Sequence, residues 1–180
     1  MIVQPTSAEK SESAEPPQSL TVDVVHEVGD WSAVDPDIET AIRTAAVAVA
    51  RAQAAHIRPG MDAVIALADD ATVRRLNGTY RAKDKPTNVL SFPSGDPTGS
   101  ALGDIVLALE TIHAEATDLG ISARHHTQHL VVHGLLHLLG FDHETDAEAT
   151  AMERLETEIL ATIGIADPYA DTELLIADAN

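Results

Sequence analysis

The sequence predicts an α+β fold, a single domain in which a mixed β-sheet of about four strands is packed with helices. The length of 180 residues fits one domain with a true core and leaves little room for a second. Short apolar runs of strand length lie early in the chain, whereas helical periodicity dominates its later half. The connections are too short for a regular series of crossovers, so a doubly wound sheet is the less favoured alternative.

In the first half of the chain, strand and helix patterns alternate. Residues 20–28 alternate in polarity and are rich in β-branched side chains, as in a half-buried strand. The Ala-rich run at 35–56 opens with Asp and Pro, which favour a helix start. Residues 62–68 form another apolar run of strand length, and capping aspartates begin a helical pattern at 69–81. These patterns predict strand, helix, strand and helix.

Two more strands and three more helices are predicted in the second half. The strand candidates at 87–92 and 104–109 flank a loop at 93–100 that is rich in Pro, Gly and Ser. Glycines and a capping Ser then separate helical patterns, which lie at 110–119, 122–139 and 145–163.

The two ends of the chain are expected to lie outside the domain at 20–169. Residues 1–19 have few apolar side chains to offset the entropy of ordering, so we expect a disordered tail, and 170–180 form a C-terminal tail. The first residues lack the basic start and apolar stretch of a secretory signal. No apolar run approaches the roughly eighteen residues that span a bilayer. We therefore expect a cytoplasmic protein with no membrane partner.

The composition excludes several kinds of site. There is no cysteine, which excludes disulfides, thiolate metal ligands and a Cys nucleophile. No glycine-rich phosphate loop follows a predicted strand, and no Gly-x-Ser-x-Gly segment is present. The formal charge of −18 opposes binding of polyanions unless cations are gathered in one place. Five of the eleven basic residues do gather, at Arg74, Arg75, Arg81, Lys83 and Lys85.

Among the nine histidines, three have the spacing of a metal site. His133 and His137 are four residues apart, so on a helix their imidazoles lie on one face. Gly140 can adopt the left-handed conformation that ends the helix, which lets His143 return to the same point. His129 lies one turn earlier, where a core or supporting role is expected in preference to ligation.

This ligand set indicates a catalytic ion. Three neutral imidazoles suit one zinc ion, Zn²⁺, and with no cysteine and no further histidine downstream the remaining coordination position is expected to hold water. The surrounding leucines and valines make the helix apolar nearly all round, so it should run through the core. Gly134 stands where zinc proteases of the zincin type carry a Glu base, and a glycine there suggests a close approach to the helix. A metal-dependent hydrolase follows, with peptide hydrolysis as the second choice.

Several segments resemble the YbeY family of single-strand-specific endoribonucleases, which act in bacterial ribosomal RNA maturation and ribosome quality control. The resemblance extends from about residue 62 to 169, and many members have Tyr where this chain has Phe141. It is carried by NGTYRAKDKPTNVLSFP at 77–93, GDIVLAL at 103–109, HGLLHLLGFDH at 133–143 and ETEILATIGIADPY at 156–169.

The resemblance implies the family's roles for matching residues. The zinc ligands map onto His133, His137 and His143, and the arginine associated with activity maps onto Arg81. It implies maturation of the 16S rRNA 3′ end, with single-stranded RNA and the ribosome or its proteins as partners. In this interpretation zinc-bound hydroxide attacks a phosphodiester, Arg81 clamps the scissile phosphate, and Lys83 and Lys85 contact the RNA backbone. A peptide or amide hydrolase, and a ribosome-associated binding protein with a structural ion, remain as alternatives.

Overall fold

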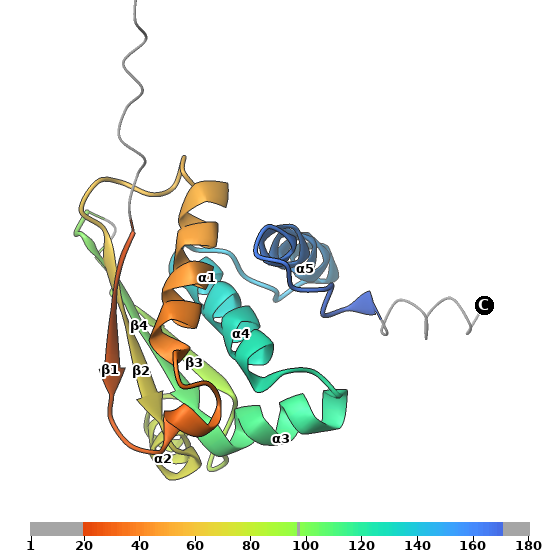
Figure 1. The fold of residues 1–180 in the computed structure, drawn as a ribbon. Coiled ribbons are helices and arrows are strands. Elements are labelled where there is room, and N and C mark those ends of the chain that lie inside the picture. The colour runs from red at the N-terminus through yellow and green to blue at the C-terminus, as the bar shows by residue number, and fades with distance from the viewer. Residues whose placement is uncertain (1–19, 97, 171–180) are drawn as a thin grey trace, which may run out of the picture.

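The computed structural model describes residues 20–96 and 98–170 (Figure 1). The predicted tails at 1–19 and 170–180 lie outside the described residues, apart from Ala170. In chain order the elements are β1 (Thr21–His26), the 3-10 helix η1 (Trp31–Ala33), α1 (Ile38–Ala52), β2 (Asp62–Ala68), α2 (Asp70–Arg81), β3 (Val89–Pro93), β4 (Ala101–Ala108), α3 (Leu109–Leu119), α4 (Ala123–Leu138) and α5 (Asp146–Ala161).

Within the described part of the chain, four strands form one mixed sheet in the order β1-β2-β4-β3. β1 is parallel to β2 and β2 to β4, whereas β3 pairs antiparallel with β4 at the edge. Helix α1 provides a crossover from β1 to β2, but the antiparallel β3 interrupts any regular series of such units. The predicted α+β fold with one mixed sheet is confirmed.

The two faces of the sheet are covered unequally. Along β4, Ile105 and Leu107 belong to the main core, whereas Val106 and Ala108 belong to a smaller apolar cluster with Val73 of α2. Alternate residues of a strand point to opposite faces, so α2 packs on the face that carries Val106 and Ala108. Helices α1 and α4 lie on the other face, and α5 packs beyond them (Figure 1).

Helix α4 runs through the core, as predicted. It contacts β3 and β4 on one side, α1 and α3 beside it, and α5 on its outer side. Its apolar residues are therefore buried around most of the helix, at Leu130, Val131, Val132, Leu135, Leu136 and Leu138. A helix covered in this way holds its side chains in fixed positions relative to the sheet, which matters for the histidines that it carries.

Local signals fix most helix ends. The Asp69 side chain accepts a hydrogen bond from the Thr72 amide at α2, and the Ser122 hydroxyl accepts one from the His125 amide at α4. Thr145 begins α5 with a reciprocal capping box. The Ala-rich helix α1 is shorter than the predicted 35–56 at both ends. It begins at Ile38, and the chain passes into turns after Ala52. No helix of the described residues is both long and apolar enough to cross a membrane.

Candidate metal centre

His133 and His137 face one another on α4. Their ring centroids are 4.6 Å apart and their Nε2 atoms 3.1 Å apart. Gly134 follows His133 in sequence and lies on the face of the helix that is closest to the sheet. A Cβ atom at this position would lie 2.8 Å from Ile105 Cδ1 and 3.1 Å from Ser91 Oγ. The close approach predicted at Gly134 is thus confirmed, and it brings the two imidazoles up to the edge of β3.

A left-handed glycine returns the chain to these two rings. Gly140 has φ of +93°, and its amide donates to the His137 carbonyl while the Phe141 amide donates to Leu136. Paired bonds of this kind form a Schellman motif, which ends a helix and reverses the chain. The His143 ring consequently lies 5.5 Å from that of His133 and 4.9 Å from that of His137.

The predicted histidines are therefore brought together as one group. One ring nitrogen from each of His133, His137 and His143 lies within 4.8 Å of the others. Two nitrogens bound to a tetrahedral zinc ion at ordinary bond lengths are roughly 3.3 Å apart, close to the separation of the first two Nε2 atoms. The group can hold a metal ion.

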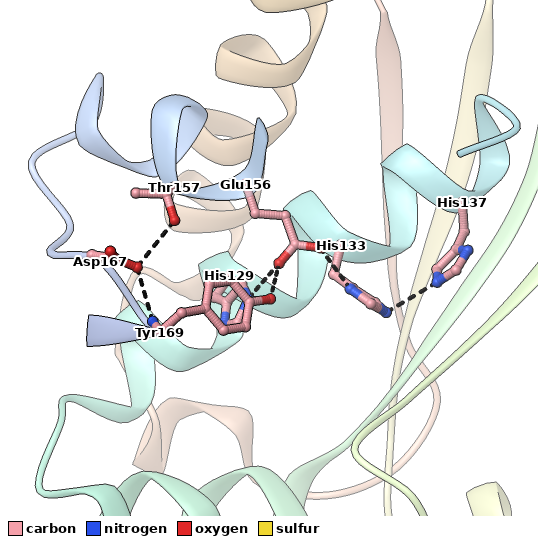
Figure 2. A network of polar contacts seen from close by, with 7 residues as sticks. All are labelled: His129, His133, His137, Glu156, Thr157, Asp167 and Tyr169. Carbon is pink, nitrogen blue, oxygen red and sulfur yellow. Dashed lines mark hydrogen bonds and ion pairs between the residues drawn. The ribbon is translucent and has the colours of Figure 1, made fainter. Parts of the chain in front are cut away.

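Hydrogen bonds at the opposite ring nitrogens set the tautomers. His133 Nδ1 lies 2.8 Å from Glu156 Oε1, and His137 Nδ1 lies 3.0 Å from the Phe141 carbonyl oxygen. Both partners are acceptors, so each Nδ1 carries the proton and each Nε2 presents a lone pair. Two such lone pairs, in the contact drawn between His133 and His137 in Figure 2, repel unless a cation lies between them. This donor set fits a metal ion.

The surroundings of His137 favour the neutral ring. Burial lowers the pKa of its imidazole, and repulsion from His133 and His143 lowers the pKa further. A neutral imidazole is the form that binds a metal, so the electrostatics and the geometry agree.

Arg81 lines the same cavity as the three histidines. The cavity has a volume of about 500 Å³, and β3, the end of α4 and the segment after it form its walls. Arg81 is the last residue of α2. The next residue, Ala82, adopts the left-handed conformation with φ of 55°. Its Nη2 donates to the Ser91 carbonyl at 3.3 Å, and no carboxylate of the described residues forms an ion pair with it. Its charge therefore remains available at the cavity.

The remaining basic residues are placed differently. Lys83 and Lys85 are exposed and do not line the histidine cavity. The Asn77 side chain donates to the Lys85 carbonyl at 2.8 Å, which fixes the backbone of this segment. Arg74 forms two hydrogen bonds with Asp84, at 2.7 and 2.9 Å, so the gathered positive charge is smaller than the sequence indicates.

Glu156 of α5 is a site residue that the sequence analysis missed. Its side chain is only 1% exposed, and one oxygen accepts from His133 while the other lies 2.7 Å from His129 Nε2 (Figure 2). His129 thus has a supporting place, as expected, and lies outside the metal-site group. The missed signal is helical spacing, because Met152, Glu156, Ile159 and Leu160 share the buried face of α5.

This network holds Glu156 in its charged form. Burial by itself raises the pKa of the Glu156 carboxyl. Hydrogen bonds from His129, His133 and the Tyr169 hydroxyl outweigh that effect and lower the pKa to about 2. Burial and the neighbouring Glu156 raise the pKa of Tyr169, so its hydroxyl remains a donor.

Comparisons with known proteins agree with this architecture. The family model for endoribonuclease YbeY matches residues 28–164. Endoribonuclease YbeY of Bradyrhizobium sp. (strain BTAi1) is 48% identical over 163 residues, which cover 86% of this chain and 95% of the relative. The Azorhizobium caulinodans protein of the same name is 48% identical over 155 residues, covering 84% of this chain and 97% of the relative.

A solved structure supports the fold. The solution structure of TM1509 from Thermotoga maritima superposes with a TM-score of 0.51 at 19% identity, covering 82% of this chain and 98% of that one. The match to the family model and the identity to its members extend over most of the chain. The chain therefore belongs to the YbeY family of endoribonucleases.

Proposed function

We propose that this chain is a single-strand-specific endoribonuclease that holds one zinc ion through His133, His137 and His143 and uses Arg81 on the scissile phosphate. Its cellular role is maturation of the 16S rRNA 3′ end and ribosome quality control, with a catalytic domain at 20–169. The observation that carries the proposal is that three imidazoles with converging nitrogens share one cavity with Arg81, in a member of an endoribonuclease family.

The three histidines supply the ligand nitrogens, and hydrogen bonds at Nδ1 orient the rings of His133 and His137. A bound zinc ion supplies Lewis acidity, which activates water near neutral pH and withdraws charge from a phosphoryl oxygen. The proton on each Nδ1 of His133 and His137 keeps Nε2 free for the ion. No Glu lies between these two ligands, because Gly134 occupies that position, so the protein base of the zincin proteases is absent. The peptidase alternative therefore has no support from this helix.

Arg81 is suited to bind the phosphate. Its guanidinium is a planar fork of donors that matches two oxygens of a phosphate and stabilises charge that develops there. The bond to the Ser91 carbonyl directs the side chain along β3 toward the cavity. Since no ion pair among the described residues neutralises Arg81, the guanidinium can meet the substrate without first breaking one.

Lys83 and Lys85 would contact the RNA outside the cavity. Both are exposed on the segment that follows Arg81, and Asn77 holds the backbone of that segment. With few cations and a net charge of −18, nonspecific RNA binding is weak, so a ribosomal protein or the ribosome would bring enzyme and substrate together. Such a substrate would place the enzyme in the cytoplasm.

The test is cleavage of matched substrates by the purified full chain. Single-stranded RNA, its duplex and an unstructured peptide are incubated with untreated, chelator-treated and zinc-restored protein. We expect cleavage of the single strand alone, its loss on chelation and its return with zinc. Cleavage of RNA that resists chelation would contradict the metal mechanism. Peptide hydrolysis without RNA cleavage would contradict the proposal that RNA is the substrate.

A further inference from the structure

Both oxygens of the buried Glu156 carboxylate are occupied, and both point toward the α4 histidines. Oε1 accepts from His133 Nδ1 at 2.8 Å. Oε2 accepts from the Tyr169 hydroxyl and lies 2.7 Å from His129 Nε2. A buried acceptor that loses its donors costs free energy, so the carboxylate cannot rotate away from His133 without leaving other groups unpaired.

The chain beyond α5 completes this arrangement. One oxygen of Asp167 accepts from the Thr157 hydroxyl at 3.0 Å and from the Tyr169 amide at 2.9 Å. These two bonds fold the chain back along α5 and carry the Tyr169 ring over His129, with the hydroxyl at Glu156 (Figure 2). The last described residues are thereby linked to His133 through one carboxylate.

Among the three site histidines of the described chain, His133 has the only charged acceptor behind it. His137 uses the main-chain carbonyl of Phe141 at 3.0 Å, on its own helix end. The acceptor for His133 comes instead from another helix, 23 residues away in sequence. A carboxylate in this position fixes the orientation of an imidazole and makes its other nitrogen a stronger ligand.

We propose that Glu156 is a positioning residue of the metal site, which holds His133 in its Nδ1-protonated, metal-facing form and is itself held by Tyr169. The inference rests on the proposed function, because it concerns affinity for the ion that the three histidines would hold. Glu156 is buried and does not touch the substrate. It acts through His133, so its loss weakens metal binding before it affects any chemical step.

The test compares zinc dissociation constants, measured in competition with a chromophoric chelator, for the wild type, Glu156→Gln and Glu153→Gln. Glu153 is a matched control, because it lies on the same helix and lines the same cavity of about 210 Å³, but is exposed and has no hydrogen bond to a histidine. We expect Glu156→Gln to weaken zinc binding about ten- to a hundredfold, and Glu153→Gln to change it by less than about threefold. Tyr169→Phe should weaken it by about a few-fold, since His129 still bonds to the carboxylate.

Equal zinc affinity in Glu156→Gln and Glu153→Gln would overturn the proposal, and a lower melting temperature of Glu156→Gln without loss of affinity would assign the residue to fold stability alone. If Glu156→Gln does not fold, nitrogen NMR of chelator-treated wild type decides. A proton on His133 Nδ1 supports the proposal, and a proton on Nε2 overturns it. A wild type that binds no zinc would overturn the proposed function itself, and this inference with it.

Discussion

At the scale of single residues, two arginines that look alike in sequence differ in whether a carboxylate neutralises their charge. Arg74 and Arg81 both belong to the basic stretch of α2. The first is paired with Asp84 through two hydrogen bonds, whereas the second, among the described residues, bonds only to a main-chain carbonyl at the histidine cavity. A free guanidinium beside a metal site is able to bind an anion, and a paired one is not.

Replacing Arg81 tests this distinction. Arg81→Lys keeps the charge but loses the fork, so single-turnover cleavage of single-stranded RNA should fall by about ten- to a thousandfold while zinc content stays unchanged. Arg75→Lys is the control, because it makes the same change on the same helix away from the cavity. Cleavage by Arg81→Lys at the wild-type rate would remove the residue from the phosphate site.

The residues of the site were not equally predictable from the sequence. His133, His137 and His143 lie within eleven residues, so helix periodicity and one glycine are enough to bring them together. Glu156 reaches them from another helix, and only tertiary packing decides which face of α4 meets α5. Its position on the buried face of α5 marks it as unusual, but periodicity alone does not name its partner.

At the scale of elements, two helix ends position the site. The α2 helix ends at Ala82 in the left-handed conformation, directly after Arg81, and α4 is followed by Gly140, directly before the return to His143. The helix stops were largely predictable, because capping side chains and glycines are local signals. The start of α1 was not, since Asp35 accepts from the Asp37 amide and pairs with Arg124, a residue 89 positions away.

Gly140 should therefore matter for both stability and metal binding. Gly140→Ala places a side chain at φ of +93°, which should reduce the free energy of unfolding by about 1–2 kcal/mol and weaken zinc affinity by displacing His143. Gly120→Ala is the matched control, because Gly120 ends α3 with φ of 65°, and as at Gly140 no atom of a described residue that is not a neighbour in the chain lies within 4 Å of an added Cβ. Denaturant unfolding and zinc competition measure the two effects. Equal zinc affinity in both variants would show that the turn does not position His143.

At the scale of the whole molecule, the strand order of the sheet determines which residues lie beside the histidine cavity. Strand order was beyond sequence analysis, because β2 pairs with β4 across an intervening helix and strand, and such contacts leave no local pattern. That order puts β3 at the sheet edge, where Ser91 lies between Arg81 and the Gly134 turn of α4. The fold class needed only the succession of elements, so it was predictable.

The net charge of −18 predicts weak, salt-dependent RNA binding. With about three phosphates neutralised, the logarithm of the association constant should fall with the logarithm of salt concentration at a slope of about −2. The double variant Lys83→Gln, Lys85→Gln should make the slope less steep by about 1.4. Fluorescence anisotropy of a labelled single strand over a salt series measures both. An affinity that is independent of salt would contradict phosphate contact.

The central claim is that His133, His137 and His143 hold one metal ion. The most direct test is the zinc content per chain of wild type, His133→Ala, His137→Ala and His143→Ala after removal of free zinc. We predict about one ion in the wild type and a sharp loss in each variant, because a three-ligand site reduced to two ligands loses most of its affinity. Full zinc occupancy in any one variant would contradict the claim for that histidine.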